Sequence, residues 1–329
     1  MKNGINPATL IASGSHEPGI SAAEFSLPLN AALRYERPDP QLRPHLTNYH
    51  VMDSVETDPL GVVDWMLPGW AAIRITLSAT PIAVTLANRR YDPVPPAAVY
   101  GVTSRAMAVS TRGGVTIGIG LSPSGWARLF RERADRLRDR ITSLDTLMQA
   151  DRVDDLMAQL RASDRGIEVK PILDQFFADH LHFPHPDEPV IAQVMALIAD
   201  DTATDIGAAA ADLGIDPERL RRLSNRYFGF PPKTLMVRAR FMRSFLRMFA
   251  KRDAADYSLV APIYHDRSHF LRDAHRFLGM TPRQFMAMKT PYLDAALRGR
   301  AAVFSARSDA RVSFTAGDHL GNRGPPTPS

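Results

Sequence analysis

The sequence predicts an α+β protein, in which a small antiparallel β-barrel or β-sandwich with helices precedes an all-α domain with two helix-turn-helix motifs. Short apolar runs with interleaved polar residues fill residues 42–121, and Pro- and Gly-rich turns separate them. From residue 170 onward, apolar residues recur at the three- and four-residue spacing of amphipathic helices. At 329 residues and 45% hydrophobic content, the chain has room for two packed domains.

Composition divides the chain into five expected parts. Residues 1–30 are rich in small and polar residues, and residues 299–329 end in a Gly- and Pro-rich run, so both are predicted to be disordered. The strand-like half occupies residues 31–183. Prolines mark a linker at residues 184–189, and residues 190–298 form the helical domain with both motifs.

Five β-strands are predicted in the first half. Each combines apolar residues with polar neighbours and is bounded by turn residues. The predicted strands cover residues 72–77, 82–86, 99–102, 107–109 and 115–121. Many short strands joined by turns are typical of a barrel or sandwich. After the strands, Trp126, Leu129 and Phe130 share one face of a predicted helix.

The second half contains a series of capped helices. Apolar stripes predict two helices before residue 200, and Thr204 caps the next one. Asp216-Pro217 begins another, because Asp is a good N-cap and Pro fits the first turn. A long helix is predicted from 233 to 250. Its arginines are expected to face solvent: Arg238, Arg240, Arg243 and Arg247.

The last helix-turn-helix motif is predicted within residues 257–285. Its first helix is indicated by apolar residues on one face, namely Leu259, Val260 and Ile263. Asp266 caps the second helix, and Gly279 is placed to end it in the left-handed conformation. The apolar stripe of this second helix consists of Phe270, Ala274, Phe277 and Leu278.

Residues that point away from these stripes are the candidate binding residues. Residues 204–289 contain 16 Lys and Arg against 8 Asp and Glu, an excess of +8, whereas the whole chain carries +5. A basic domain with two such motifs predicts binding to double-stranded DNA, with the second helix of each motif in a major groove. The candidates are Glu218, Arg221, Arg222 and Asn225 in the first motif, and Arg267, Ser268, His269, Leu271, Arg272 and Arg276 in the second.

The last motif resembles the second helix-turn-helix of the AraC/XylS family of transcription regulators. That motif typically reads Gly-Phe-x-Asp-x-Ser-x-Phe-x-Arg-x-Phe-Lys, then Gly-x-Thr-Pro and an aromatic residue. The matching residues are Asp266, Ser268, Phe270, Arg272, Gly279, Thr281, Pro282 and Phe285. Departures are Tyr264-His265 in place of Gly-Phe and Ala274-His275 in place of Phe-Lys.

The first motif also resembles the family pattern, and so does part of the strand-like half. In the first motif Ser224 replaces the usual core phenylalanine. The matching residues there are Ile206, Ala210, Gly214, Leu220, Arg222, Leu223, Gly229 and Pro232. Residues 67–74, 101–105 and 117–130 look like the N-terminal domain of one AraC-like subfamily.

The resemblance implies a sequence-specific transcription regulator, either an activator or a repressor, in the cytoplasm and at the nucleoid. It implies that the N-terminal domain binds a small-molecule effector, forms a homodimer, or does both. RNA polymerase is the further partner that an activator would have. Arg222 and Arg272 occupy motif positions from which the family tends to meet DNA.

Other classes of site are less well supported by the sequence. Gly118-Ile119-Gly120 lacks the spacing of a dinucleotide-binding loop, and His180, His182 and His185 lie near linker prolines without a cysteine beside them. The sequence shows no nucleophile elbow and no phosphate-binding loop. We therefore predict no catalytic residue, no cofactor and no metal. No apolar run reaches the length of a membrane span, so no membrane is predicted among the partners.

A competing interpretation comes from a different class of protein. Ser224, Tyr264 and His265 depart from the family pattern, so the chain is alternatively an effector-binding or scaffolding protein whose helical domain has lost DNA specificity. Salt-dependent binding to DNA distinguishes the two interpretations.

Overall fold

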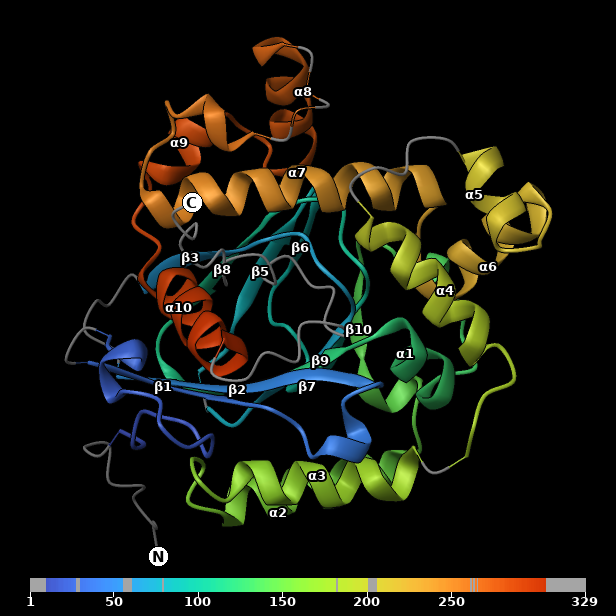
Figure 1. The fold of residues 1–329 in the computed structure, drawn as a ribbon. Helices are drawn as coiled ribbons and strands as arrows, with labels where there is room; N and C mark the ends of the chain where they lie inside the picture. The colour runs from blue at the N-terminus through green and yellow to red at the C-terminus, as the bar shows by residue number, and fades with distance from the viewer. Residues whose placement is uncertain are drawn as a thin grey trace, which may run out of the picture.

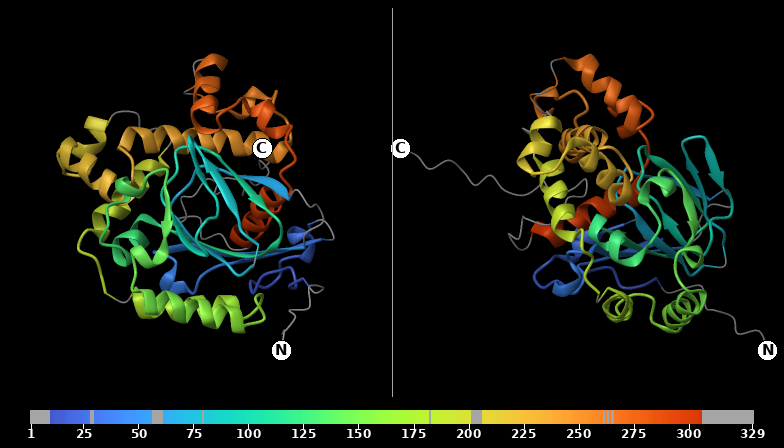
Figure 2. Two further views of the ribbon diagram at one scale, coloured as in Figure 1. Left: turned by 180° about the vertical axis from the view of Figure 1, so that it is seen from behind. Right: turned by 90° about the vertical axis from the view of Figure 1, so that its right-hand side faces the viewer.

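The structure is a computed structural model that shows two β-sheets surrounded by helices (Figure 1). It describes residues 10–27, 30–55, 61–78, 80–181, 183–200, 206–260, 262, 264 and 266–305. In the side view of Figure 2, helices α4 to α9 gather on one flank of the sheets. The predicted α+β class is confirmed.

The described strands form two antiparallel sheets. A six-stranded sheet has the order β1-β2-β9-β4-β7-β10, and a four-stranded sheet has the order β3-β8-β5-β6. In the first sheet the strands are β1 (Ala31–Glu36), β2 (Leu46–Ser54), β9 (Gly114–Leu121), β4 (Ala72–Thr76), β7 (Ala97–Tyr100) and β10 (Ile141–Ser143). In the second they are β3 (Val62–Met66), β8 (Met107–Thr111), β5 (Ala83–Leu86) and β6 (Arg89–Tyr91).

The helices cover the first sheet and then form the C-terminal half. The α-helices are α1 (Pro123–Leu129), α2 (Ala150–Ala162), α3 (Val169–His180), α4 (Glu188–Ala199), α5 (Ile206–Asp212), α6 (Pro217–Phe228), α7 (Pro232–Lys251), α8 (Arg267–Phe277), α9 (Pro282–Met286) and α10 (Pro291–Ser305). The short 3-10 helices are η1 (Ala22–Phe25), η2 (Pro40–Leu42), η3 (Ala134–Leu137), η4 (Leu144–Thr146) and η5 (Tyr257–Leu259).

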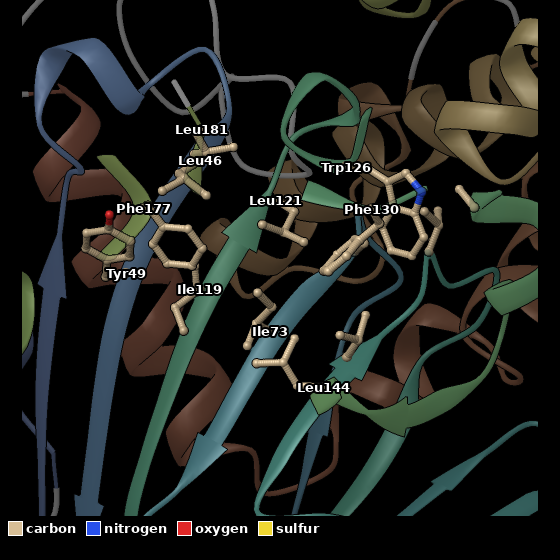
Figure 3. Packing of buried hydrophobic residues seen from close by; sticks show 14 of the residues in the cluster. Leu46, Tyr49, Ile73, Ile119, Leu121, Trp126, Phe130, Leu144, Phe177 and Leu181 are labelled. Atoms are coloured by element: carbon tan, nitrogen blue, oxygen red, sulfur yellow. The ribbon is translucent and has the colours of Figure 1, made fainter. Parts of the chain in front are cut away.

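The two faces of the six-stranded sheet differ in chemistry. On one face, fully buried side chains such as Tyr49, Ile73 and Ile119 pack under helices (Figure 3). Tyr49 stacks on Phe177 of α3 with ring centroids 6.4 Å apart. The opposite face carries polar side chains and lines an interior cavity that also borders the four-stranded sheet. The alternation of side chains along each strand separates these two environments.

One hydrophobic core continues from the sheet into the first helix-turn-helix motif. The same buried cluster contains Ile73 and Trp126 together with Leu220 and Phe228 of α6. Trp70 meets the Phe228 ring edge-on at 5.8 Å. A second cluster joins the C-terminal part of α7 to α8 and α9. The predicted linker at residues 184–189 therefore does not separate two hydrophobic cores, and α4 already begins at its fifth residue.

Two segments predicted to be disordered are ordered in part. Within the arm predicted at residues 1–30, Phe25 is fully buried, because α10 and the buried Leu33 of β1 pack around it. Within the tail predicted at residues 299–329, α10 continues to Ser305 and its Val303 is fully buried. The prediction was wrong there, since each segment is stabilised by packing on the other and on β1.

Candidate nucleic-acid interface

Helix α6 forms as its sequence predicts. The Asp216 carboxylate accepts a hydrogen bond from the backbone N–H of Arg219 at 2.8 Å, and Pro217 opens the helix. Gly229 ends the helix with φ +74°, a left-handed conformation that glycine adopts without strain. The inner face is buried and consists of Leu220, Leu223, Ser224, Tyr227 and Phe228. The capping and apolar pattern thus fix which residues α6 presents to solvent.

The outer face of α6 carries the first set of predicted residues. Glu218 and Arg221 are both exposed and form an ion pair with a nitrogen–oxygen distance of 2.8 Å. This pairing lowers the pKa of Glu218 and partly neutralises Arg221. Arg222 is exposed and has no ion pair within the described residues, whereas Asn225 is only partly exposed. Sequence reasoning omitted two further exposed arginines of this helix, Arg219 and Arg226.

Helix α8 is also capped and packed as predicted. The Asp266 carboxylate accepts from the backbone N–H of His269 at 2.7 Å. Gly279 has φ +80° just beyond the end of the helix. The predicted apolar stripe is buried, with 2% exposure or less at each of its members, Phe270, Ala274, Phe277 and Leu278.

The outer face of α8 presents the second set of predicted residues. Arg267, Ser268, Arg272 and Arg276 are exposed, and His269 and Leu271 are partly exposed. Arg267 lies over the Tyr257 ring at 4.7 Å, and Arg276 lies over the Phe277 ring at 5.1 Å. Arg272 has no ion pair with its neighbour Asp273 or with any other described residue. In place of that contact, Asp273 accepts a hydrogen bond from the Tyr264 hydroxyl at 2.9 Å.

The first helix of the second motif is shorter than predicted. Only the 3-10 helix η5 is formed, and Val260 has extended backbone with ψ 140°. Of the predicted stripe, Leu259 ends η5 and Val260 is already outside it. Ile263 and His265 lie outside the described residues, as does the predicted cap Thr204 of the first motif.

Two departures from the family pattern are offset by packing. Tyr264, which stands where the family has glycine, meets the Phe270 ring edge-on at 5.2 Å. Ala274 replaces a core phenylalanine. In the same buried cluster as Ala274, the Phe241 ring of α7 lies 5.4 Å from both the Phe270 and the Phe277 rings. Aromatic pairs at such distances add stability beyond their buried area.

The long helix α7 does not expose its arginines as predicted. Arg238 is 5% exposed and Arg243 is 6% exposed. The Arg238 guanidinium donates to the carbonyl oxygens of Gly69 at 3.2 Å and Thr103 at 2.8 Å, so it ties α7 to the β-sheet half. Burial lowers the pKa of Arg238 to about 10. The Arg238 side chain can be buried because the neighbouring loops supply carbonyl acceptors for its guanidinium. Only Arg240 and Arg247 remain partly exposed.

The alternative sites have structural explanations. Gly118 and Gly120 lie in β9, where an added Cβ would fall 2.1 Å from the His50 ring and 2.1 Å from Thr47 Oγ1. Small residues at these two positions leave room for side chains of the neighbouring strand. Among the described residues, no group of three or more His, Asp or Glu side chains could hold a metal ion, and His182 lies outside them. None of the described helices is both long and apolar enough to cross a membrane.

Comparisons with known proteins give structural similarity at low sequence identity. No protein-family model and no curated protein matches the chain. Fatty-acid-bound ToxT from Vibrio cholerae strain SCE256 is similar at TM-score 0.41 and 9% identity, over 80% of this chain and 98% of that chain. For ToxT from Vibrio cholerae O395 the TM-score is 0.39 at 11% identity, over 72% of this chain and 95% of that chain. For the AraC-like transcriptional activator CuxR the TM-score is 0.24 at 10% identity, over 59% of this chain and 80% of that chain.

Proposed function

We propose that the protein is a sequence-specific transcription regulator that binds double-stranded DNA through the outer faces of α6 and α8. The observation that carries the proposal is the pair of capped helices, one before α7 and one packed on it, each with a buried apolar face and a basic outer face. A helix of this kind enters a major groove, where arginine can meet guanine O6 and N7 with two hydrogen bonds.

The charge distribution on the two helices supports the proposal. Six exposed arginines of α6 and α8 have no ion pair with a described carboxylate, namely Arg219, Arg222, Arg226, Arg267, Arg272 and Arg276. Arginines that are not paired with a carboxylate keep their charge for phosphates and base edges. Because Arg238 and Arg243 of the connecting helix α7 are buried, these two arginines hold the helix in place rather than contact phosphates.

The test of the proposal is the salt dependence of binding to duplex DNA. If about five phosphates are neutralised, log K against log salt has a slope of about −4 to −5. Fluorescence anisotropy with a fixed duplex measures this slope, and selection from random oligonucleotides with the full-length protein supplies the preferred site. A slope near zero, or a selection that returns no motif, refutes the proposal and leaves the scaffolding alternative.

A further inference from the structure

A turn at Asp139 concentrates positive charge on the surface of the β-sheet half. Arg138 and Arg140 flank this residue in the sequence, and both are exposed. Arg89, an exposed residue of β6, reaches the same turn and donates to the carbonyl oxygen of Asp139 at 3.4 Å. Residues that are far apart in the sequence therefore bring their guanidinium groups to one place.

A further segment of the β-sheet half is held against this turn. The Asp139 carboxylate accepts from the backbone N–H of Ser104 at 2.6 Å and from the Ser104 hydroxyl at 2.7 Å. The next residue along the chain, Arg105, is exposed. The turn and this segment together present four exposed arginines, which we call the basic cluster: Arg89, Arg105, Arg138 and Arg140.

Two carboxylates beside the basic cluster are engaged by other groups. Asp135 pairs with Arg133 at a nitrogen–oxygen distance of 2.7 Å. Burial lowers the pKa of Arg238 of α7, and the charge of Asp139 acts in the opposite direction, so Asp139 serves as a counter-charge for that buried guanidinium. The four cluster arginines have no ion pair with a carboxylate of the described chain. Their charge is therefore available to an external anion.

The basic cluster lies beside the C-terminal end of α6. Helix η3 packs against α6, and a Cβ added at Gly229, which ends α6, would lie 3.4 Å from the Ala134 carbonyl oxygen of η3. The Arg138 guanidinium lies over the Phe230 ring, with its carbon 5.1 Å from the ring centroid. This cation–π contact positions an arginine that remains exposed.

The same cluster extends to the C-terminal end of α8. The backbone N–H of Ala106, which follows Arg105, donates at 2.8 Å to the carbonyl oxygen of Phe277, the last residue of α8. Arg238 of α7 donates to the Thr103 carbonyl oxygen at 2.8 Å, which fixes this segment to the connecting helix. The β-sheet half thus places basic side chains beside the ends of both helices for which we propose groove binding.

We propose that the basic cluster binds the phosphate backbone of the DNA between the two groove segments that α6 and α8 enter; this inference rests on the proposed function. Major-groove segments on one face of B-DNA lie one helical turn, about 34 Å, apart. The minor groove and its two flanking backbones lie between them, and a guanidinium binds phosphate with strong, charge-assisted hydrogen bonds. Because phosphate contacts carry no sequence information, the cluster adds affinity and orientation but no base preference.

The first test measures the salt dependence of binding after two cluster charges are removed. Full-length Arg138→Gln/Arg140→Gln is titrated by fluorescence anisotropy on the duplex that wild type selects and on an unrelated duplex. The slope of log K against log salt should become shallower by about two, and both duplexes should be weakened by the same factor. The matched control, Arg152→Gln/Arg161→Gln, removes two exposed arginines from α2, on the opposite side of the molecule from α8 (Figure 1), and should keep the wild-type slope.

The outcomes of this test separate the role of the cluster from the proposed function. If wild type binds with a steep salt dependence and the cluster variant has the same slope, the role of the cluster is overturned and the function stands. Equal losses in the cluster and control variants also overturn it, because the effect is then one of general charge. If wild type binds no duplex, the function is refuted and this inference with it.

A single position separates charge from folding. The Arg140 side chain has no contact within the described residues, so Arg140→Gln should keep the wild-type melting temperature and make the slope shallower by about one. Arg140→Lys should restore the wild-type slope, because counterion release depends on the number of charges at the phosphates. An unchanged slope in Arg140→Gln, or a Lys variant as weak as the Gln variant, overturns the proposal.

The last experiment locates the contact on the DNA. Single phosphates of the selected duplex are replaced by uncharged methylphosphonates, and wild type is compared with Arg138→Gln/Arg140→Gln. Neutralising a phosphate between the two recognised groove segments should weaken wild type severalfold and leave the double variant unaffected, because the two changes remove the same contact. If every methylphosphonate weakens both proteins alike, the basic cluster contacts no phosphate there and the inference is overturned.

Discussion

Replacement of Arg272 by Ala separates base recognition from folding, because Arg272 has no ion-pair or hydrogen-bond partner among the described residues. The side chain is exposed on α8, and the buried Asp273 beside it is already engaged by the Tyr264 hydroxyl. The free energy of unfolding should therefore change by less than about 0.5 kcal/mol. Binding to the preferred site should weaken by about 1–3 kcal/mol, which is roughly 5- to 150-fold.

The assay for Arg272→Ala is selection from random oligonucleotides, followed by anisotropy titration on the selected site. Preference should relax at one base pair, because one side chain reads one position. Arg152→Ala is the matched control, since it removes the same charge from an exposed position on α2, on the opposite side of the molecule from α8 (Figure 1). If Arg272→Ala returns the parent motif with unchanged information at every position, base recognition by Arg272 is refuted. Equal losses in both variants would reduce its role to general charge.

Three further predictions concern stability. Burial raises the pKa of Asp64 to about 6 from its ordinary 3.8, so the folded state holds the proton more tightly than the unfolded state. The free energy of unfolding should therefore fall by up to about 3 kcal/mol as pH rises from about 4 to about 6. Urea titrations of wild type and Asp64→Asn check this, and an equal pH dependence in both proteins contradicts it. Tyr264→Phe should cost about 1–3 kcal/mol, because it leaves the buried Asp273 without its donor, whereas Tyr257→Phe serves as a control in the same denaturation experiment and should cost less. Residues 189–289 alone should keep the site preference of the full chain but melt at a lower temperature, since the core of α6 continues into the sheet; an unchanged melting temperature would show that the shared core contributes nothing.

The local features of the helical half could be predicted from the sequence because their causes are local. The carboxylates of Asp216 and Asp266 each accept a hydrogen bond from the backbone N–H three residues later. Gly229 and Gly279 each follow the last turn of their helix. Such capping needs only a few consecutive residues. The apolar stripe of α8 follows the same logic, since one periodicity fixes which side is buried.

The strands were predicted less completely, because polar residues occupy buried positions on both faces of the first two strands. Strand β2 places Asn48, His50 and Met52 on its interior face, and β1 places Arg34 and Glu36 in a buried ion pair at 2.8 Å. Neither strand shows the alternation of apolar and polar residues that marks an ordinary half-buried strand. Polar residues among the buried positions of these strands remove the apolar–polar contrast that predicts a strand, so β1 and β2 were missed.

The arginines of α7 show where periodicity alone fails. Arg238 and Arg243 were predicted to face solvent because they are charged, yet both are buried, and Arg238 is held by two carbonyl oxygens from loops more than 100 residues away in sequence. No local pattern can reveal an acceptor that the fold supplies from elsewhere. The same holds for Arg74 and Arg300, which lie 226 positions apart in the sequence and meet at one cavity. Charge that long-range contacts bury is therefore the feature that most needs the structure.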